Sequence, residues 1–399
     1  MLKSKNFSYL LLGRLMSNLG SSVYSIVIVW SIVQTTNSSL WIGIYYFSLY
    51  LPGIFSFLFG NIIDKTSKRK LLIFLEVGSL LGTSLLAFFI SLDLYFPLIL
   101  CTLAFIVANF DNHTYAVQDA YTQLTVEKKD LEKASSYQYM TYQIGGYLFN
   151  AIIGFAMLYI GQIYIVLFSV FAYGISVMFF INLEDKKVLK NDDEKTIINE
   201  DNVFSGFIYI FQNKLLLLLM ITGALINFFF SGLGVYLVLI ANGHNSSFIF
   251  GIINTSIPFG GLIGSVILAK WLFKNIPLGK KHVISYFLFG IGLLFIGFFT
   301  TTLIIIIPLV IAGLFLGVSH VTSTPIMQSL IPEKDFGKIM SSIYTITVGV
   351  MPLGALAFGV LANRINSSVF FTIFGAIYII VACLYRANSR LWNLSLQKD

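Results

Sequence analysis

Charged and polar side chains inside apolar stretches are the residues of this sequence best suited to chemistry. Asp111 stands within the run "PLILCTLAFIVANFDNHTYAVQ", where an unpaired charge is costly to bury. At helical spacing it shares one face with Tyr115, Gln118 and Thr122. Asp111 is therefore either a protonatable carboxyl that faces a central cavity or a packing carboxylate. In the second case it pairs with Arg14 or is hydrogen-bonded to a neighbour.

Arg14 heads a polar stripe on the first apolar stretch. Asn18, Ser21, Ser22 and Ser25 follow it at helical spacing. Because polar groups are costly to expose to lipid, this stripe is expected to face the interior of a helix bundle. Arg14 itself either belongs to that interior or extends its long side chain to the membrane surface.

Two more titratable residues lie within apolar stretches. His320 shares a face with Thr324 and Gln328, so it either moves a proton, binds an anionic substrate, or forms a hydrogen bond between helices. Glu76 lies about one turn inside its segment, where a solvated or paired carboxylate is favoured. The candidates for proton coupling are Asp111, His320 and Glu76. The candidates for substrate contact are Arg14, Asn18, Ser22, Tyr24, Tyr115, Gln118, Tyr139, Asn150, Asn227 and Tyr344.

The composition indicates that membrane helices position these residues. The chain has 399 residues, of which 57% are hydrophobic and 11% charged, with a mean hydropathy of +0.85. Its apolar runs reach the roughly 20 residues that cross a bilayer as a helix, without the alternation of barrel strands. The two cysteines lie in apolar runs and have no metal-ligand spacing. We expect an all-α integral membrane protein that binds the lipid bilayer, without cofactor, metal or nucleic acid.

Twelve transmembrane helices are predicted. Almost all Lys and Arg residues fall on the side that holds the N-terminus, so both termini are expected to be cytoplasmic. The net charge of +7 is explained by this asymmetry. The predicted spans are 8–34, 40–63, 71–92, 96–120, 135–158, 163–183, 215–240, 248–270, 283–300, 303–328, 339–362 and 367–386.

A polar linker divides the chain into two halves. The segment 184–203 has mixed charge and no apolar period, so the predicted domains are 1–183, the cytoplasmic linker 184–203, and 204–399 with a lead-in amphipathic helix. The stretches from Gln123 and Gln328 match at several positions, and both join a fourth span to a fifth. This repeat predicts two pseudo-symmetric six-helix halves.

The stretch "GNIIDKTSKRK", residues 60–70, resembles the loop motif between the second and third helices of the major facilitator superfamily. Ser67 replaces the second glycine of that motif. The resemblance implies that the aspartate lies against the start of the eleventh helix, while the cations pair with an acid that here is Asp119. We expect a latch that holds the inner side closed, formed by Gly60, Asp64, Lys65, Lys68, Arg69 and Asp119.

A second resemblance, from Phe110 through "DLEKASS" and in "IPEKDFGKIMSS", is to the efflux branch with macrolide exporters and enterobactin-type siderophore exporters. His113 and Tyr115 depart from that branch's usual residues. The stretch "IGGYLFNAIIGF" resembles the antiporter pattern of the fifth helix, in which Asn150 occupies the position of a proline. The arginine that many proton-coupled drug antiporters carry midway along the fourth helix does not occur here. The resemblance implies a major facilitator fold and efflux more directly than it implies proton coupling.

These features predict a secondary-active exporter of small amphipathic molecules, such as a drug, a macrolide-like compound or a siderophore. It would work by alternating access, as a proton antiporter and a monomer in a bacterial cell membrane. No Walker motif indicates direct use of ATP. An importer or uncoupled facilitator of a metabolite remains an alternative. A membrane-embedded lipid-modifying enzyme is disfavoured because the loops hold no cluster of catalytic residues.

Overall fold

The structure is a computed structural model, and it describes residues 5–55, 59, 63, 66–126, 134, 137–138, 141, 149–150, 152–184, 205–269, 276–299, 303–331 and 336–395. Every regular element in these ranges is a helix. The chain divides into two compact units, Met1–Asn202 and Val203–Asp399. Nine of the described helices are long and apolar enough to cross a membrane.

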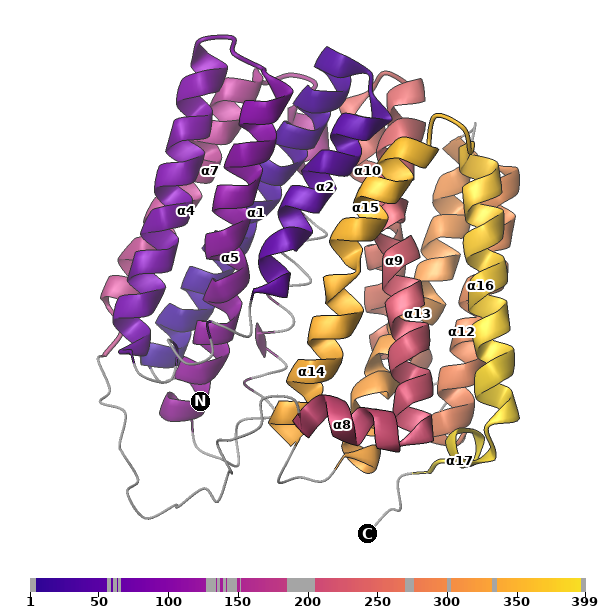
Figure 1. Cartoon of the computed structure of the whole chain (residues 1–399). Helices are drawn as coiled ribbons and strands as arrows, with labels where there is room; N and C mark the ends of the chain where they lie inside the picture. The colour runs from indigo at the N-terminus through magenta and orange to yellow at the C-terminus, as the bar shows by residue number, and fades with distance from the viewer. Residues whose placement is uncertain are drawn as a thin grey trace. The chain divides into compact units, whose positions relative to one another are not determined.

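Unit 1 is a bundle of long helices (Figure 1). Within it α1 packs against α7, and α4 packs against both α5 and α7. Proline at the start of α5 suits the first turn of a helix, where the missing N–H has no partner to lose. The described helices of this unit are α1 (Lys5–Thr36), α2 (Ser39–Ile54), α4 (Lys68–Ser91), α5 (Pro97–Thr125) and α7 (Gln162–Ile181).

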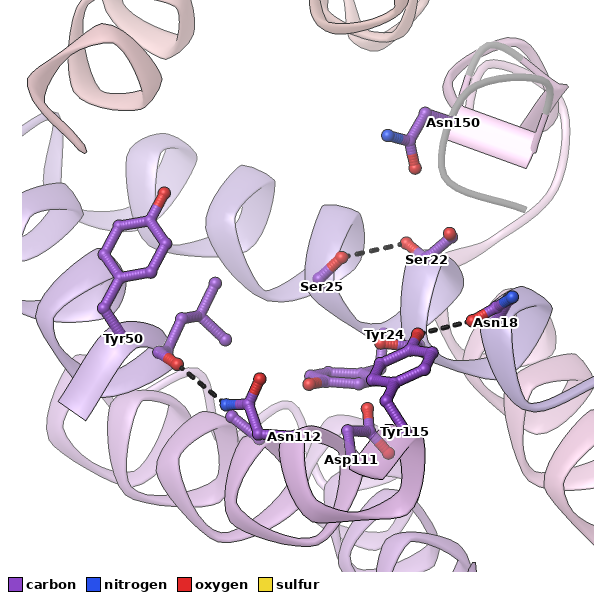
Figure 2. A pocket seen from close by; sticks show the side chains of 12 residues that line it. Asn18, Ser22, Tyr24, Ser25, Tyr50, Asp111, Asn112, Tyr115 and Asn150 are labelled. Carbon is purple, nitrogen blue, oxygen red and sulfur yellow. Dashed lines mark hydrogen bonds between the residues drawn. The ribbon is translucent and has the colours of Figure 1, made fainter. Parts of the chain in front are cut away.

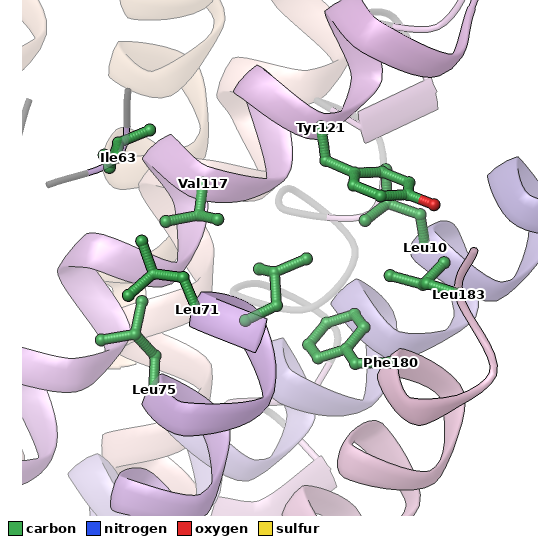
Figure 3. Close-up of a cluster of buried hydrophobic side chains, with 9 residues drawn as sticks. Leu10, Ile63, Leu71, Leu75, Val117, Tyr121, Phe180 and Leu183 are labelled. Carbon is green, nitrogen blue, oxygen red and sulfur yellow. The ribbon is translucent and has the colours of Figure 1, made fainter. Parts of the chain in front are cut away.

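An apolar cluster holds one end of unit 1 together (Figure 3). It joins side chains of α1, α4, α5 and α7, among which Leu72, Val117 and Phe180 are fully buried. Small residues bring α1 and α7 close: Ser176 and Ser169 donate to the carbonyls of Gly13 and Gly20, at 2.9 and 2.7 Å. The helices around Asp111 are therefore fixed by both apolar and polar contacts.

Unit 2 begins with the short helix α8 (Ser205–Gln212), which runs across the lower ends of its neighbours in Figure 1. Ile208 and Phe211 on α8 are exposed whereas Ile210 is fully buried, so this helix is amphipathic. The longer helices of the unit are α9 (Lys214–Gly243), α10 (Ser247–Ile263), α12 (Leu278–Phe298), α13 (Ile306–Leu330), α14 (Phe336–Gly349), α15 (Met351–Leu361) and α16 (Ser367–Ala387).

Two features of unit 2 differ from the simple spans that the sequence predicts. The span 339–362 is broken at Val350, between α14 and α15, because Pro352 cannot donate a backbone hydrogen bond to the preceding turn. The span that follows α9 ends in a π-helical turn, Gly264–Leu268. After α16, the short helix α17 (Ser389–Trp392) packs on α12 and α16.

Candidate functional site

A polar cavity of about 310 Å³ lies in unit 1; we call it the Asp111 pocket. Helix α1 contributes its polar stripe, with Asn18, Ser22 and Tyr24, and α5 contributes Asp111 and Tyr115. Figure 2 shows these side chains converging on the pocket, with Tyr50 and Asn150 at its other edges. The structure thus brings together six of the predicted site residues: Asn18, Ser22, Tyr24, Asp111, Tyr115 and Asn150.

Asp111 is held by donors from two other helices. Ser79 Oγ of α4 donates to Asp111 Oδ1 at 2.7 Å, and Tyr173 of α7 donates from its hydroxyl to Oδ2 at 2.8 Å and to Oδ1 at 3.0 Å. Asp111 is only 7% exposed, and both donor residues are fully buried. Hydrogen bonds to a carboxylate stabilise its charged form, whereas burial opposes it. A group balanced in this way is suited to binding and releasing a proton.

The position of Tyr173 follows from the packing of α7 on α1. Its ring lies over Gly20, where a Cβ atom would approach the ring to 2.8 Å. The missing side chain at Gly20 therefore lets the phenol cross α1 and reach Asp111. Ser79 reaches the same carboxylate because α4 packs against α5.

Glu76 lies one turn before Ser79 on α4 and is fully buried, with 0% exposure. Neither carboxylate oxygen has a hydrogen-bond partner among the described residues. The nearby Ser176 donates instead to Gly13. The sequence favoured a solvated or paired carboxylate here, and that interpretation is wrong. The helix is packed by its neighbours at this depth, so Glu76 is closed off from solvent.

Arg14 pairs with Asp119, not with Asp111. Its Nη1 lies 2.8 Å from Asp119 Oδ1, and its guanidinium stands 5.1 Å above the centre of the Tyr115 ring. The predicted alternative of an Arg14–Asp111 pair is therefore wrong. The Arg14 side chain is 8% exposed and that of Asp119 is 58% exposed, so Arg14 belongs to the bundle interior whereas Asp119 reaches its edge.

The remaining candidates on α5 and α1 form a short polar chain. The Tyr115 hydroxyl donates to Asn18 Oδ1, and Asn18 Nδ2 donates to the carbonyl of Thr141 at 3.1 Å. Gln118 is fully buried, and neither its Oε1 nor its Nε2 has a partner among the described residues. Gln118 is not among the described residues that line the Asp111 pocket.

A second cavity, also about 310 Å³, lies in unit 2. We call it the tyrosine–histidine pocket, since Tyr286, Tyr378, Tyr385, His282 and His320 line it. None of its described lining residues carries a fixed charge. Its rings pack on one another, with centroids 5.3 Å apart both for Tyr286 and Tyr378 and for Tyr286 and Tyr385. Such a lining suits apolar and aromatic parts of a ligand.

Three predicted residues lie in this second pocket: Asn227, His320 and Tyr344. Asn227 Nδ2 donates to the carbonyl of Thr347 at 3.0 Å, while Tyr344 is 52% exposed. His320 is exposed to the cavity. The histidine hydrogen-bonded between helices is His282 instead, whose Nδ1 lies 2.9 Å from Thr322 Oγ1.

The predicted latch is only partly within the described residues. Lys68 Nζ donates to the carbonyls of Ile63 and Thr66, and Arg69 Nη2 donates to the carbonyl of Ile181 at 2.6 Å. The described cations of the loop thus bind main-chain oxygens, whereas Asp119 binds Arg14. Gly60, Asp64, Lys65 and Tyr139 lie outside the described residues.

Several residues of both sites were missed from the sequence. Tyr173 and Ser79, the donors to Asp111, were not predicted, and neither were His282, Tyr286, Tyr378 and Tyr385. The described residues contain no group of three potential metal ligands. The described linings of both pockets combine hydrogen-bonding, aromatic and aliphatic side chains.

Comparison with known proteins identifies the family. The sequence model of the Major Facilitator Superfamily matches residues 10–348 of this chain. The chain belongs to the Major Facilitator Superfamily. The family resemblance of the loop motif is thereby confirmed, and the protein is a transporter and not an enzyme.

Two relatives show which members of the superfamily this chain is similar to. Macrolide efflux protein A of Streptococcus pyogenes is 24% identical over 402 residues, which covers 96% of each chain. The staphyloferrin A transporter of Staphylococcus aureus is 30% identical over 151 residues. That second match spans 38% of this chain and 37% of the transporter.

Solved structures share the fold. The nucleoside transporter NupG matches with a TM-score of 0.73 and 15% identity, covering 96% of this chain and 98% of NupG. A D-xylose–proton symporter matches with a TM-score of 0.71 and 13% identity, covering 98% of both chains. The all-helical superfamily fold with multiple membrane spans is therefore shown for this protein.

Proposed function

We propose that this chain is a secondary-active exporter of small amphipathic molecules and that it exchanges them for protons. The observation that carries the proposal is Asp111, a buried carboxyl that lines a polar cavity and is held by Ser79 and Tyr173. A carboxyl that touches both a cavity and a buried hydrogen-bond network can bind, in turn, a proton and a cationic or hydrogen-bond-donating group of the substrate. If proton and substrate compete for one carboxyl group, this competition is sufficient to couple substrate export to proton import.

The substrate proposal rests on the relatives and on the second pocket. A macrolide-like compound or a siderophore is supported by the names of the two relatives. The aromatic, uncharged lining of the tyrosine–histidine pocket suits the apolar part of such a molecule. Import or uncoupled passage of a metabolite is the alternative. The direction in which substrate moves under an imposed proton gradient distinguishes this alternative from export.

The proposal includes the topology. We place twelve spans in two halves, 1–183 and 204–399, joined by the linker 184–203, with both termini in the cytoplasm of a bacterial cell and the protein as a monomer. The excess of Lys and Arg on one side supports this orientation. The loop at 60–70, together with Asp119, is retained as a latch, anchored through Lys68 and Arg69.

The test is transport in inverted membrane vesicles with an imposed proton gradient. Vesicles that contain the wild-type protein should accumulate radiolabelled erythromycin or staphyloferrin A when their interior is acidic, and an uncoupler should abolish this uptake. Asp111→Asn should lose gradient-driven uptake. Asp93→Asn is the matched control, because Asp93 is exposed and its φ of 55° is tolerated by asparagine.

Two results would contradict the proposal. Gradient-driven uptake by Asp111→Asn at the wild-type rate would remove Asp111 from the coupling. Accumulation that requires an alkaline interior would show movement of substrate and proton in the same direction, which is symport. Equal expression and a monodisperse elution profile of both variants are required before the rates are compared.

A further inference from the structure

A shallow cationic cavity of about 570 Å³ lies at one end of unit 2, where α8, the start of α9 and α17 meet. Lys214 and Arg390 line it, and the amide side chains of Gln212, Asn213 and Asn388 surround them. Both cations are exposed. Among the described residues no carboxylate lines the cavity or pairs with either cation. The described lining of the cavity therefore presents two positive charges and three amide side chains, and it contains no carboxylate.

Apolar and aromatic groups beside this cavity mark the boundary between lipid and water. Phe211 and Ile208 on α8 are 63% and 46% exposed. Trp392 lies under two more cations, with the Arg386 guanidinium 4.1 Å and the Lys280 ammonium 5.5 Å from its ring centre. Tryptophan together with Arg and Lys is typical of the membrane interface. An amphipathic helix such as α8 typically lies in the plane of that interface.

We propose that this cavity binds the phosphate of an anionic phospholipid headgroup. Lys214 and Arg390 would neutralise the phosphate, and the guanidinium of Arg390 can offer it two parallel hydrogen bonds. The acyl chains would lie along the exposed apolar side chains of α8. The site is separate from the Asp111 pocket, which lies in the other unit.

The chemistry favours an anionic amphiphile over other ligands. Two positive charges in a lining whose described residues include no carboxylate favour a phosphate, and the neighbouring apolar surface favours a phosphate that carries acyl chains. Free phosphate satisfies only the first of these two features. A zwitterionic phospholipid brings its own cation to the site, which the two basic side chains repel.

The experiment measures lipid retention by the full-length protein. The protein is purified in detergent, titrated with phosphatidylglycerol or phosphatidylcholine, and analysed by native mass spectrometry. The test variant is Lys214→Gln combined with Arg390→Gln. The control variant is Lys281→Gln combined with Arg364→Gln, which makes the same chemical changes at residues outside the cavity. All variants must elute as one species with an unchanged melting temperature in the absence of lipid.

Phosphatidylglycerol is expected to bind the wild-type protein more tightly than phosphatidylcholine. Each cation near a membrane surface contributes about 5-fold to affinity, so the test variant should lose about 30-fold while the control keeps wild-type affinity. An equal loss in both variants, or no loss in the test variant, would overturn the proposal. Displacement of phosphatidylglycerol by millimolar inorganic phosphate would identify free phosphate as the ligand and would also overturn it.

Discussion

The hydroxyl of Tyr173 spans both carboxylate oxygens of Asp111, at 2.8 Å from Oδ2 and 3.0 Å from Oδ1. The two residues come from α7 and α5 and are 62 positions apart in the sequence. The phenol that binds the carboxylate is fully buried, and the same carboxyl group lines the Asp111 pocket. A residue from another helix therefore contacts both oxygens of the carboxyl group that lines the pocket.

Tyr173→Phe should displace the pH dependence of transport. Loss of the hydroxyl removes a donor that stabilises the ionised carboxylate, so Asp111 should keep its proton to a higher pH. We expect the curve of transport rate against pH to move toward alkaline values, by an amount set by one hydrogen bond to a charged group, which is worth about 1.5–3 kcal/mol. Proton-driven uptake in vesicles measures the curve. Tyr164→Phe, at an exposed tyrosine of the same helix, is the control and should leave the curve in place.

Glu76→Gln should remove a pH dependence of stability. An ionised Glu76 would be a buried charge without a hydrogen-bond partner among the residues that the structure describes, which is costly. The melting temperature of the wild-type protein should therefore fall as the pH rises, and the glutamine variant should melt with a weaker dependence. Thermal unfolding in detergent between acidic and alkaline pH measures this. Parallel curves for the two proteins would show that Glu76 binds the same number of protons in the folded and unfolded states, which would contradict this prediction.

The Arg14–Asp119 pair should show a small coupling energy. Asp119 is more than half exposed, and solvent screens such a pair, so we expect a coupling of about 0.2–1 kcal/mol in a double-mutant cycle. Arg14→Gln alone should destabilise more than Asp119→Asn, because it also loses the contact with the Tyr115 ring. Melting temperatures of the two single variants and the double variant provide the cycle. Identical losses in both single variants would contradict the role of the ring.

Gly313→Ala should destabilise unit 2. A Cβ atom at Gly313 would overlap the carbonyl of Ile257 on α10, and backbone cannot move aside as a flexible side chain does. Overpacking of this kind costs about 1–3 kcal/mol. Gly349→Ala is the control, since nothing lies within 4 Å of its added Cβ. Thermal unfolding compares the two, and equal melting temperatures would contradict the close packing of α10 on α13.

His320→Gln should weaken substrate binding without changing the pH curve. His320 lines the tyrosine–histidine pocket, whereas the residues around Asp111 lie in the other unit. Loss of one hydrogen bond corresponds to about a 2- to 10-fold weaker apparent affinity. The half-saturating substrate concentration in vesicles measures this, with His244→Gln, outside the described lining, as control. A displaced pH curve with unchanged affinity would assign His320 to proton transfer instead.

The family and the polar stripe of α1 could be predicted from the sequence because charges and polar runs stand out against an apolar background. Asp111 and Arg14 are of this kind. Tyr173 was missed because the chain has 21 tyrosines, and helical spacing alone does not say which of them reaches a carboxylate on another helix. The partner of Arg14 was missed for a related reason: Asp119 and Asp111 lie eight positions apart on one helix, and only tertiary packing selects between them.

His282 was missed from the sequence for a different reason. The predicted span began at residue 283, so His282 counted as a loop residue, whereas α12 begins at Leu278 and buries the histidine against Thr322. The burial of Glu76 depends on how closely the surrounding helices pack, which hydropathy does not measure. Membership of a helix follows from local pattern, but depth within a bundle does not.

The break at Val350 gives one span of unit 2 two separately anchored arms. Thr347 of α14 accepts from Asn227 of α9. Helix α15 packs against the same helix further along, where the ring centres of Phe358 and Tyr236 lie 6.3 Å apart. Pro352 has already removed the backbone hydrogen bond that would stiffen the joint. Changing the angle between the arms therefore breaks one main-chain hydrogen bond fewer than it would in an unbroken helix. Tyr344 and Thr347 line the tyrosine–histidine pocket, and both belong to α14. A ligand bound beside them would therefore contact α14, and it could tilt that helix relative to α15.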